Sequence, residues 1–86
     1  MTTQLTAEQR RAAGFLLGNF ARPILIRRNV TGTTMHFIPL RVYLHAEVLR
    51  VEGLATYAEP GSDWDWFPAD FATERYTLGP SPEGQS

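Results

Sequence analysis

Apolar side chains near the N-terminus recur with the period of an α-helix. Four of them share one helix face at the spacing i, i+3, i+4, i+7: Ala13, Leu16, Leu17 and Phe20. Thr6 and Gln9 fit a capping box, in which the Thr6 hydroxyl accepts from the Gln9 amide and the Gln9 side chain reaches back. Pro23 ends the pattern, because a proline pushes the preceding residue out of the helical region. The sequence therefore predicts a helix at about 7–21.

Phe15 falls on the opposite side of this helix from the apolar face. Gly14 and Gly18 lie one turn apart beside it, where they would allow another backbone to approach closely, although each costs a helix about 1 kcal/mol relative to alanine. Two interpretations of Phe15 remain open. The ring is singly exposed or covered by the C-terminal segment, or it contacts a partner.

The next segments have the composition of β-strands. β-Branched residues after Pro23 predict a first strand at about 24–30, and the sequence TGTT at 31–34 predicts a turn. Together they indicate a hairpin over 24–38. Pro39 has no N–H to donate to a neighbouring strand, and it therefore indicates a sheet edge, a bulge or a break.

Residues 40–50 allow two interpretations. Side chains alternate with a period of two from Arg41 to Val48, which favours a strand. The spacing of Leu40, Leu44 and Val48 also suits a helix, which is the main alternative. A further strand follows, in which we expect Gly53 to form a bulge or a tight bend.

The sequence GSDWDWFPADF, residues 61–71, combines aromatic and acidic side chains. In an extended strand, Trp64 and Trp66 lie on one face, and Asp63 and Asp65 lie on the other. Burial of two tryptophans would be a large gain for so small a core. The rings therefore either pack over the sheet or form a contact surface, and both interpretations remain open.

The remaining residues complete the expected fold. Pro68 at a first helical position predicts one or two helical turns at about 68–75. We expect an α+β fold in which an N-terminal helix packs on a four- to five-stranded, mainly antiparallel sheet, with a short C-terminal helical turn. We expect residues 1–78 to form a single domain and the Pro-, Gly- and Ser-rich residues 79–86 to form a flexible tail.

Composition limits the class of protein. The 86-residue chain is 43% hydrophobic, which is enough for one compact core. It contains no cysteine, which excludes disulfides, thiolate metal sites and a cysteine nucleophile. Neither a leader-like segment nor a membrane-spanning apolar run is present in the sequence, and we therefore expect a cytoplasmic protein with no membrane partner.

Charge divides unevenly along the chain. Residues 1–41 contain six arginines and one acid, a net charge of +5, whereas residues 42–86 contain two arginines and eight acids, a net charge of −6. Five arginines of the first half form the candidate nucleic-acid surface: Arg10, Arg11, Arg22, Arg27 and Arg28. Nucleic-acid binding is the alternative function and not the main one. The acidic half would repel phosphate, and neighbouring residues of a strand face opposite sides of the sheet and cannot all join one surface.

Residues that could carry catalysis or bind a metal form no recognisable motif. Asp63 and Asp65 lack the ligand spacing and glycine of a calcium loop, and His36 and His45 share no ligand pattern. All three serines lie in the predicted turn and tail, which argues against a serine nucleophile. We therefore expect no enzyme activity, no cofactor and no metal.

The aromatic and acidic segment is the strongest candidate contact surface. Six of the ten aromatic residues and five acids fall within residues 57–76, and a negative rim around apolar rings would suit a basic protein surface. The candidate partner-binding residues are Phe15, Asp63, Trp64, Asp65, Trp66, Phe67, Asp70 and Glu74. We predict a non-catalytic protein-binding module. Homodimer formation through a strand edge or Phe15 is the structural alternative.

In size, lack of catalytic motifs and predicted architecture, the whole chain resembles phage-encoded accessory proteins, among them the anti-CRISPR inhibitors. The resemblance implies that the protein inhibits a larger host assembly by occupying a basic surface. The resemblance rests on general features, because no shared motif assigns a functional role to any residue of this chain.

Overall fold

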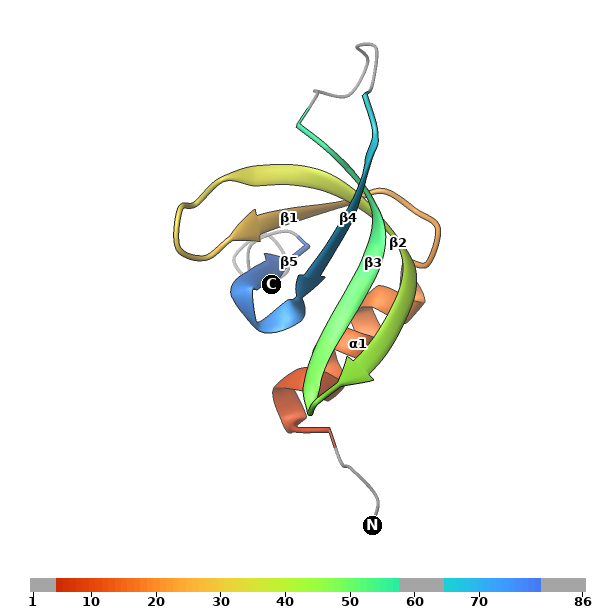
Figure 1. Ribbon diagram of the computed structural model, residues 1–86, viewed down its shortest axis with the longest axis vertical. Coiled ribbons are helices and arrows are strands. Elements are labelled where there is room, and N and C mark those ends of the chain that lie inside the picture. Colours follow the sequence, from red (N-terminus) through yellow and green to blue (C-terminus); the bar gives the residue numbers. More distant parts are fainter. Residues whose placement is uncertain (1–4, 58–64, 80–86) are drawn as a thin grey trace.

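The computed structural model describes residues 5–57 and 65–79 of the chain (Figure 1). In chain order the elements of these residues are α1 (Ala7–Gly18), β1 (Ile24–Arg28), β2 (Thr34–His45), β3 (Val48–Thr56), β4 (Phe67–Ala72), the 3-10 helix η1 (Thr73–Arg75) and β5 (Tyr76–Leu78). The predicted α+β fold, with its N-terminal helix, antiparallel sheet and C-terminal helical turn, is confirmed. The predicted tail at 79–86 lies outside the described residues, apart from Gly79.

The strands form one antiparallel sheet in the order β4-β3-β2-β1-β5. β1 to β4 are successive neighbours, and β5 returns to the far side of β1. β4 and β5 are thus the two edge strands, yet only the three residues of η1 separate them along the chain. So short a link requires the sheet to curl until its edges lie close together. The ring centroids of Phe71 in β4 and Tyr76 in β5 are accordingly 4.1 Å apart.

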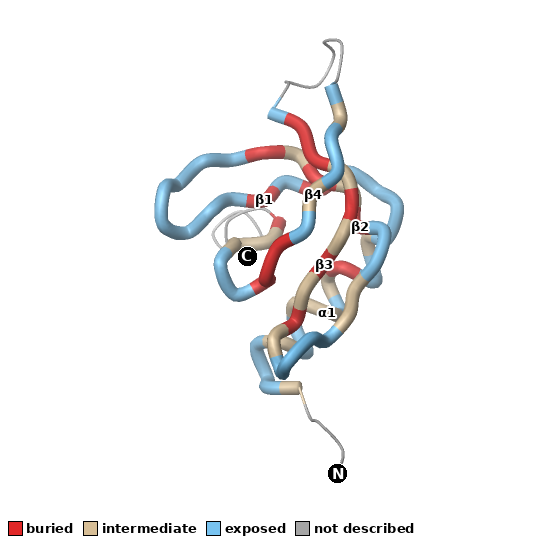
Figure 2. Tube along the Cα trace, in the orientation of Figure 1, coloured by how far each residue is buried: buried red, intermediate tan, exposed pale blue. Residues whose placement is uncertain are grey.

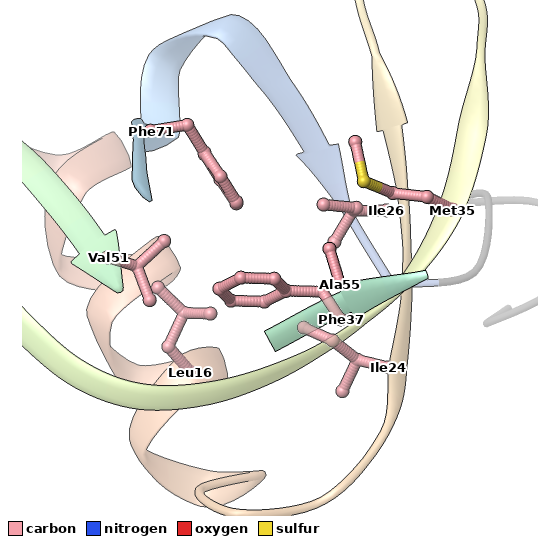
Figure 3. Close-up of a cluster of buried hydrophobic side chains, with 8 residues drawn as sticks. All are labelled: Leu16, Ile24, Ile26, Met35, Phe37, Val51, Ala55 and Phe71. Carbon is pink, nitrogen blue, oxygen red and sulfur yellow. The ribbon is translucent and has the colours of Figure 1, made fainter. Parts of the chain in front are cut away.

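The curled sheet and α1 enclose one hydrophobic core, which lies in the middle of the molecule (Figures 2 and 3). Eight buried residues form its central cluster: Leu16, Ile24, Ile26, Met35, Phe37, Val51, Ala55 and Phe71. Phe37 lies at the centre, and its ring meets that of Phe71 edge to face at 5.0 Å. Tyr76 and Leu78 of β5 pack against this cluster. Burial of this apolar surface is the main contribution to the stability of the fold.

α1 begins with the predicted capping box. The Thr6 hydroxyl accepts from the Gln9 amide at 3.0 Å, and the Gln9 side chain accepts from the Thr6 amide at 2.9 Å. The helix ends at Gly18, earlier than predicted, and Asn19 forms its C-terminal cap. The capping box therefore identifies where the helix starts, whereas Pro23 marks only a limit that the helix does not reach.

The buried face of α1 is rotated relative to the prediction. Leu16 is fully buried, but Leu17 and Phe20 are 59% and 42% exposed, so the predicted apolar face is wrong at these two positions. Phe20 lies beyond the end of the helix, where helical spacing no longer applies. Phe15 instead packs on the core, and its ring lies so close to Gly79 that a Cβ there would be 2.7 Å from Cζ. The C-terminal part of the chain thus covers Phe15.

Residues 40–50 form the end of one strand, a tight turn and the start of the next strand. β2 continues to His45, so the helical alternative is wrong. Ala46 and Glu47 both have positive φ, 51° and 67°, and make a two-residue hairpin turn before Val48. The sequence hides this turn, because neither residue is a glycine or asparagine and the alternation of apolar and polar residues runs through it unbroken.

β2 and β3 approach each other closely beside a bulge. The register shifts between Pro39 and Arg41, which confirms the bulge, one of the three possibilities for Pro39. Gly53 is paired inside β3, and the prediction that it forms a bulge or bend is wrong. A Cβ at Gly53 would collide with the carbonyl oxygen of Ile38 and lie 2.8 Å from the ring of Phe37. The close approach of the two backbones therefore requires a glycine.

The predicted helical segment at 68–75 is wrong over most of its length. β4 continues as a strand to Ala72, and only η1 is helical. Pairing with β3 outweighs the helical signal of Pro68, because Phe71 must lie opposite Val51 to complete the core. A proline is tolerated in β4 because this strand lies at the edge of the sheet.

Substitution of two glycines by alanine tests the packing of β2 on β3. We expect Gly53→Ala to lower the free energy of unfolding by at least about 2 kcal/mol, because backbone atoms of β2 must move. Gly14→Ala is the matched control, since a Cβ there meets nothing within 4 Å, and it should raise stability by about 0.5–1 kcal/mol. Urea denaturation followed by circular dichroism measures both changes. Equal stability of the two variants would contradict the observed packing.

Candidate functional site

The described candidate partner-binding residues lie in three separate places. Asp63 and Trp64 lie outside the described residues. The others lie just before and at the start of β4 (Asp65, Trp66 and Phe67), farther along β4 (Asp70), and between α1 and η1 (Phe15 and Glu74). The single contact surface expected from the sequence is thus divided among different parts of the fold.

The first place is an exposed ring pair at one end of the β3–β4 ladder. Tyr57, directly after β3, is 62% exposed, and Phe67, the first residue of β4, is 38% exposed. Their ring centroids lie 5.9 Å apart. Asp65 is exposed and Trp66 is half-buried in the two residues before Phe67. We call Tyr57, Asp65, Trp66 and Phe67 the aromatic tip.

The strand register explains why the aromatic tip is accessible. Phe67 is paired with Ala55, a residue of the core cluster. Its ring therefore lies on the side of the sheet that faces the core. The β3–β4 end, however, reaches beyond the rest of the sheet (Figure 1). Ala55 is the last core residue of β3 at this end, and the tip residues beside and beyond it are mostly exposed (Figure 2). The rings of Tyr57 and Phe67 thus have the strand positions of core residues but lie at the surface.

The second place is a polar network on the outer face of β2, β3 and β4. Asp70 accepts hydrogen bonds from the Tyr43 hydroxyl at 2.7 Å and from Nε of Arg50 at 2.9 Å, and it forms an ion pair with Arg50. Next to this group, Arg41 pairs with Glu52 at 3.4 Å and lies over the ring of Tyr43. We call these five residues the outer network. Its two positive and two negative charges cancel, so Asp70 offers a partner little net charge.

The outer network shifts the pKa values of its members. The hydrogen bond from the Tyr43 hydroxyl, followed by that from Arg50, lowers the pKa of Asp70, although partial burial opposes the shift. The same bond to the Asp70 carboxylate raises the pKa of Tyr43. Both shifts favour the ionised carboxylate and the protonated tyrosine that are present near neutral pH. Neither group is therefore tuned to act as a general acid or base there.

The outer network was not predicted from the sequence, although one of its residue pairs could have been. Once Ala46 and Glu47 are identified as a two-residue turn, counting back along the hairpin pairs Tyr43 with Arg50. The place of Asp70 depends on the register of β4 against β3, which no local signal indicates.

The third place is a groove between α1 on one side and η1 and β5 on the other. Phe15 and Glu74, two of the candidate partner-binding residues, both line it. Glu8, Arg11 and Tyr76 lie along the same groove. Residues far apart in the sequence thus come together here, and two candidate residues of opposite character, an aromatic ring and an acid, share one concave surface.

The five arginines of the nucleic-acid alternative are distributed over several surfaces. Arg10 and Arg11 lie in the first half of α1, and Arg22 lies beyond its C-terminal end. Arg27 and Arg28 are consecutive residues of β1, so their side chains leave opposite faces of the sheet. All five are exposed, but the fold does not align them as one stripe.

Features that would indicate a particular class of protein are not found in the described part of the chain. These residues include no group of histidine, aspartate and glutamate side chains that could hold a metal ion. No helix within them is long and apolar enough to cross a membrane. No family model matches the chain, and neither a curated protein nor a solved structure matches it.

The lowered pKa of Asp70 predicts how the outer network responds to acid. A carboxyl group whose pKa is depressed by folding stabilises the fold above its unfolded pKa of about 3.9 and loses this contribution as the pH falls through the folded value. Near neutral pH, Asp70→Asn should therefore lower the free energy of unfolding by up to about 1 kcal/mol. The difference from wild type should shrink below about pH 4.

Urea denaturation of wild type, Asp70→Asn and the control Asp65→Asn at a series of pH values measures this difference. Asp65 is exposed and forms no ion pair with any described residue, so its variant should track the wild type more closely. A stability difference for Asp70→Asn that stays constant down to acidic pH would contradict the assignment of the network to the ionised carboxylate.

Proposed function

We propose that the protein is a non-catalytic protein-binding module that contacts a basic partner surface through the aromatic tip. The observation that carries the proposal is the ring pair of Tyr57 and Phe67, which is exposed in the folded chain beside Asp65. Aromatic residues are enriched at the centres of protein interfaces, where they provide most of the binding energy.

The charge of the tip supports a basic partner. Asp65 is an exposed carboxylate next to rings that can also stack on a guanidinium group. Asp70, in contrast, is left out of the proposed contact, because Arg50 and Tyr43 already occupy its carboxylate. Asp63 and Trp64 are kept as proposed contact residues on the basis of the sequence alone. Inhibition of a host assembly, as in the phage proteins that the chain resembles, is a further proposal from size and composition.

Two tip variants test the proposed contact. Wild-type protein immobilised as bait should retain a specific protein from an extract of the organism that encodes it, and the purified partner should then be titrated calorimetrically. We expect Tyr57→Ala and Asp65→Arg each to weaken binding about tenfold or more, since truncation of a central interface residue costs about 2 kcal/mol.

Val30→Ala is the matched control, because Val30 is 84% exposed in the turn between β1 and β2, away from the tip. It should bind as wild type does. If the two tip variants bind the partner as tightly as this control, the aromatic tip is not the contact surface and the proposal fails.

A further inference from the structure

A groove of about 630 Å³ separates α1 from η1 and β5. Its lining combines apolar surface from Ala12, Phe15 and Tyr76 with carboxylates from Glu8 and Glu74. Phe15 and Tyr76 also pack against the core, so these rings form a firmly held floor. The groove therefore offers a concave surface on which aromatic rings and charged groups lie together.

The backbone of β5 adds hydrogen-bonding groups to this groove. The Gly79 amide donates to the Leu25 carbonyl, and the Asn29 amide donates to the Arg75 carbonyl. In an antiparallel pair the bonded residues alternate, so the backbone groups of Tyr76 and Leu78 point away from β1. The Tyr76 amide donates to η1, but the Tyr76 carbonyl and both backbone polar groups of Leu78 face an edge that no strand of the described residues covers.

We propose that this groove binds an extended segment of a partner protein that carries a lysine or arginine, and that the segment adds to β5 as a sixth strand. Its backbone would bond to Leu78 and to the Tyr76 carbonyl. Since side chains of a strand alternate, every second one would enter the groove between β5 and α1. This surface is separate from the aromatic tip, and the inference does not depend on the proposed function.

The charges along the groove favour a basic side chain in the segment. Glu8 and Glu74 contribute two carboxylates and Arg11 one guanidinium group, so these three residues carry a net charge of −1. None of the three forms an ion pair with another described residue. A cation placed over the rings of Phe15 and Tyr76 would gain from both the carboxylates and the aromatic faces.

The opposite edge of the sheet is less suited to the same use. In the two-residue hairpin the pair His45 and Val48 is hydrogen-bonded, and alternation from there directs the backbone groups of Pro68, Asp70 and Ala72 away from β3. Pro68 has no N–H to offer at that edge, which is a common way to protect an edge strand. The groove also runs along β5 and not along β4.

A capped peptide, Ac-TVTKTVT-NH2, provides the probe for the test. Titration into the ¹⁵N-labelled full chain should cause saturable chemical-shift changes at the amides of Tyr76, Leu78 and Phe15. The same peptide with glutamate in place of lysine should bind at least about fivefold more weakly. A third peptide, N-methylated at every second residue on the side that faces β5, should lose binding because it lacks the required N–H groups.

Variants of the protein distinguish strand addition from unspecific contact. Leu78→Pro removes the outward N–H. Leu78→Ala keeps this N–H although it removes more of the side chain, so only Leu78→Pro should lose the peptide. Glu74→Gln should weaken binding of the lysine peptide, and Arg11→Gln should tighten it at least about twofold. A gain of binding in Arg11→Gln cannot result from loss of folding.

Several results would overturn the proposal. One is the absence of saturable shifts at the β5 amides, and another is equal binding of the lysine and glutamate peptides. Equal binding by Leu78→Pro and Leu78→Ala, or by the N-methylated peptide, would exclude strand addition. If light scattering shows a dimer and the β5 amides shift with protein concentration alone, a second copy occupies the edge and the proposal is wrong.

Discussion

The three-residue link η1 between the two edge strands constrains the rest of the structure. β4 and β5 lie at opposite edges of the sheet, so a link of this length can join them only if the sheet curls around its own core. The rings of Phe71 and Tyr76, on either side of the link, then lie in close contact, and Phe37 fills the centre of the core. An 86-residue chain that contains no cysteine thereby buries one continuous apolar cluster.

Curling brings the two edges of the sheet close together. The outward backbone groups of both edge strands, β4 and β5, nevertheless have no partner strand in the described part of the chain. Curling also places α1 opposite β5, and Phe15, which lines the groove, lies close to Gly79. The β3–β4 end projects beyond the core and carries the aromatic tip. The surfaces that suit a partner are therefore consequences of the fold: each lies where the core or the ladder of backbone hydrogen bonds ends.

The elements that could be predicted are those determined by neighbouring residues. The capping box at Thr6 and the alternation in β2 were sufficient for the helix start and the strands. The rest depends on contacts distant in sequence. The helical signal of Pro68 is outweighed by pairing with β3, and Asp70 meets Arg50 only through the register of that pairing. Of the candidate site, the exposure of Asp65 could be expected, whereas the groove at Phe15 could not, because it forms between the two ends of the described chain.

Amide hydrogen exchange of β5 in the isolated protein tests the account most directly, because the orientation of this strand determines both how the sheet closes and what its edge can bind. The amide of Gly79 donates to Leu25 and should be strongly protected, whereas the amide of Leu78 faces outward and should exchange much faster. Equal protection of the two amides would contradict the open edge at β5, and the groove would then not be a site for an added strand.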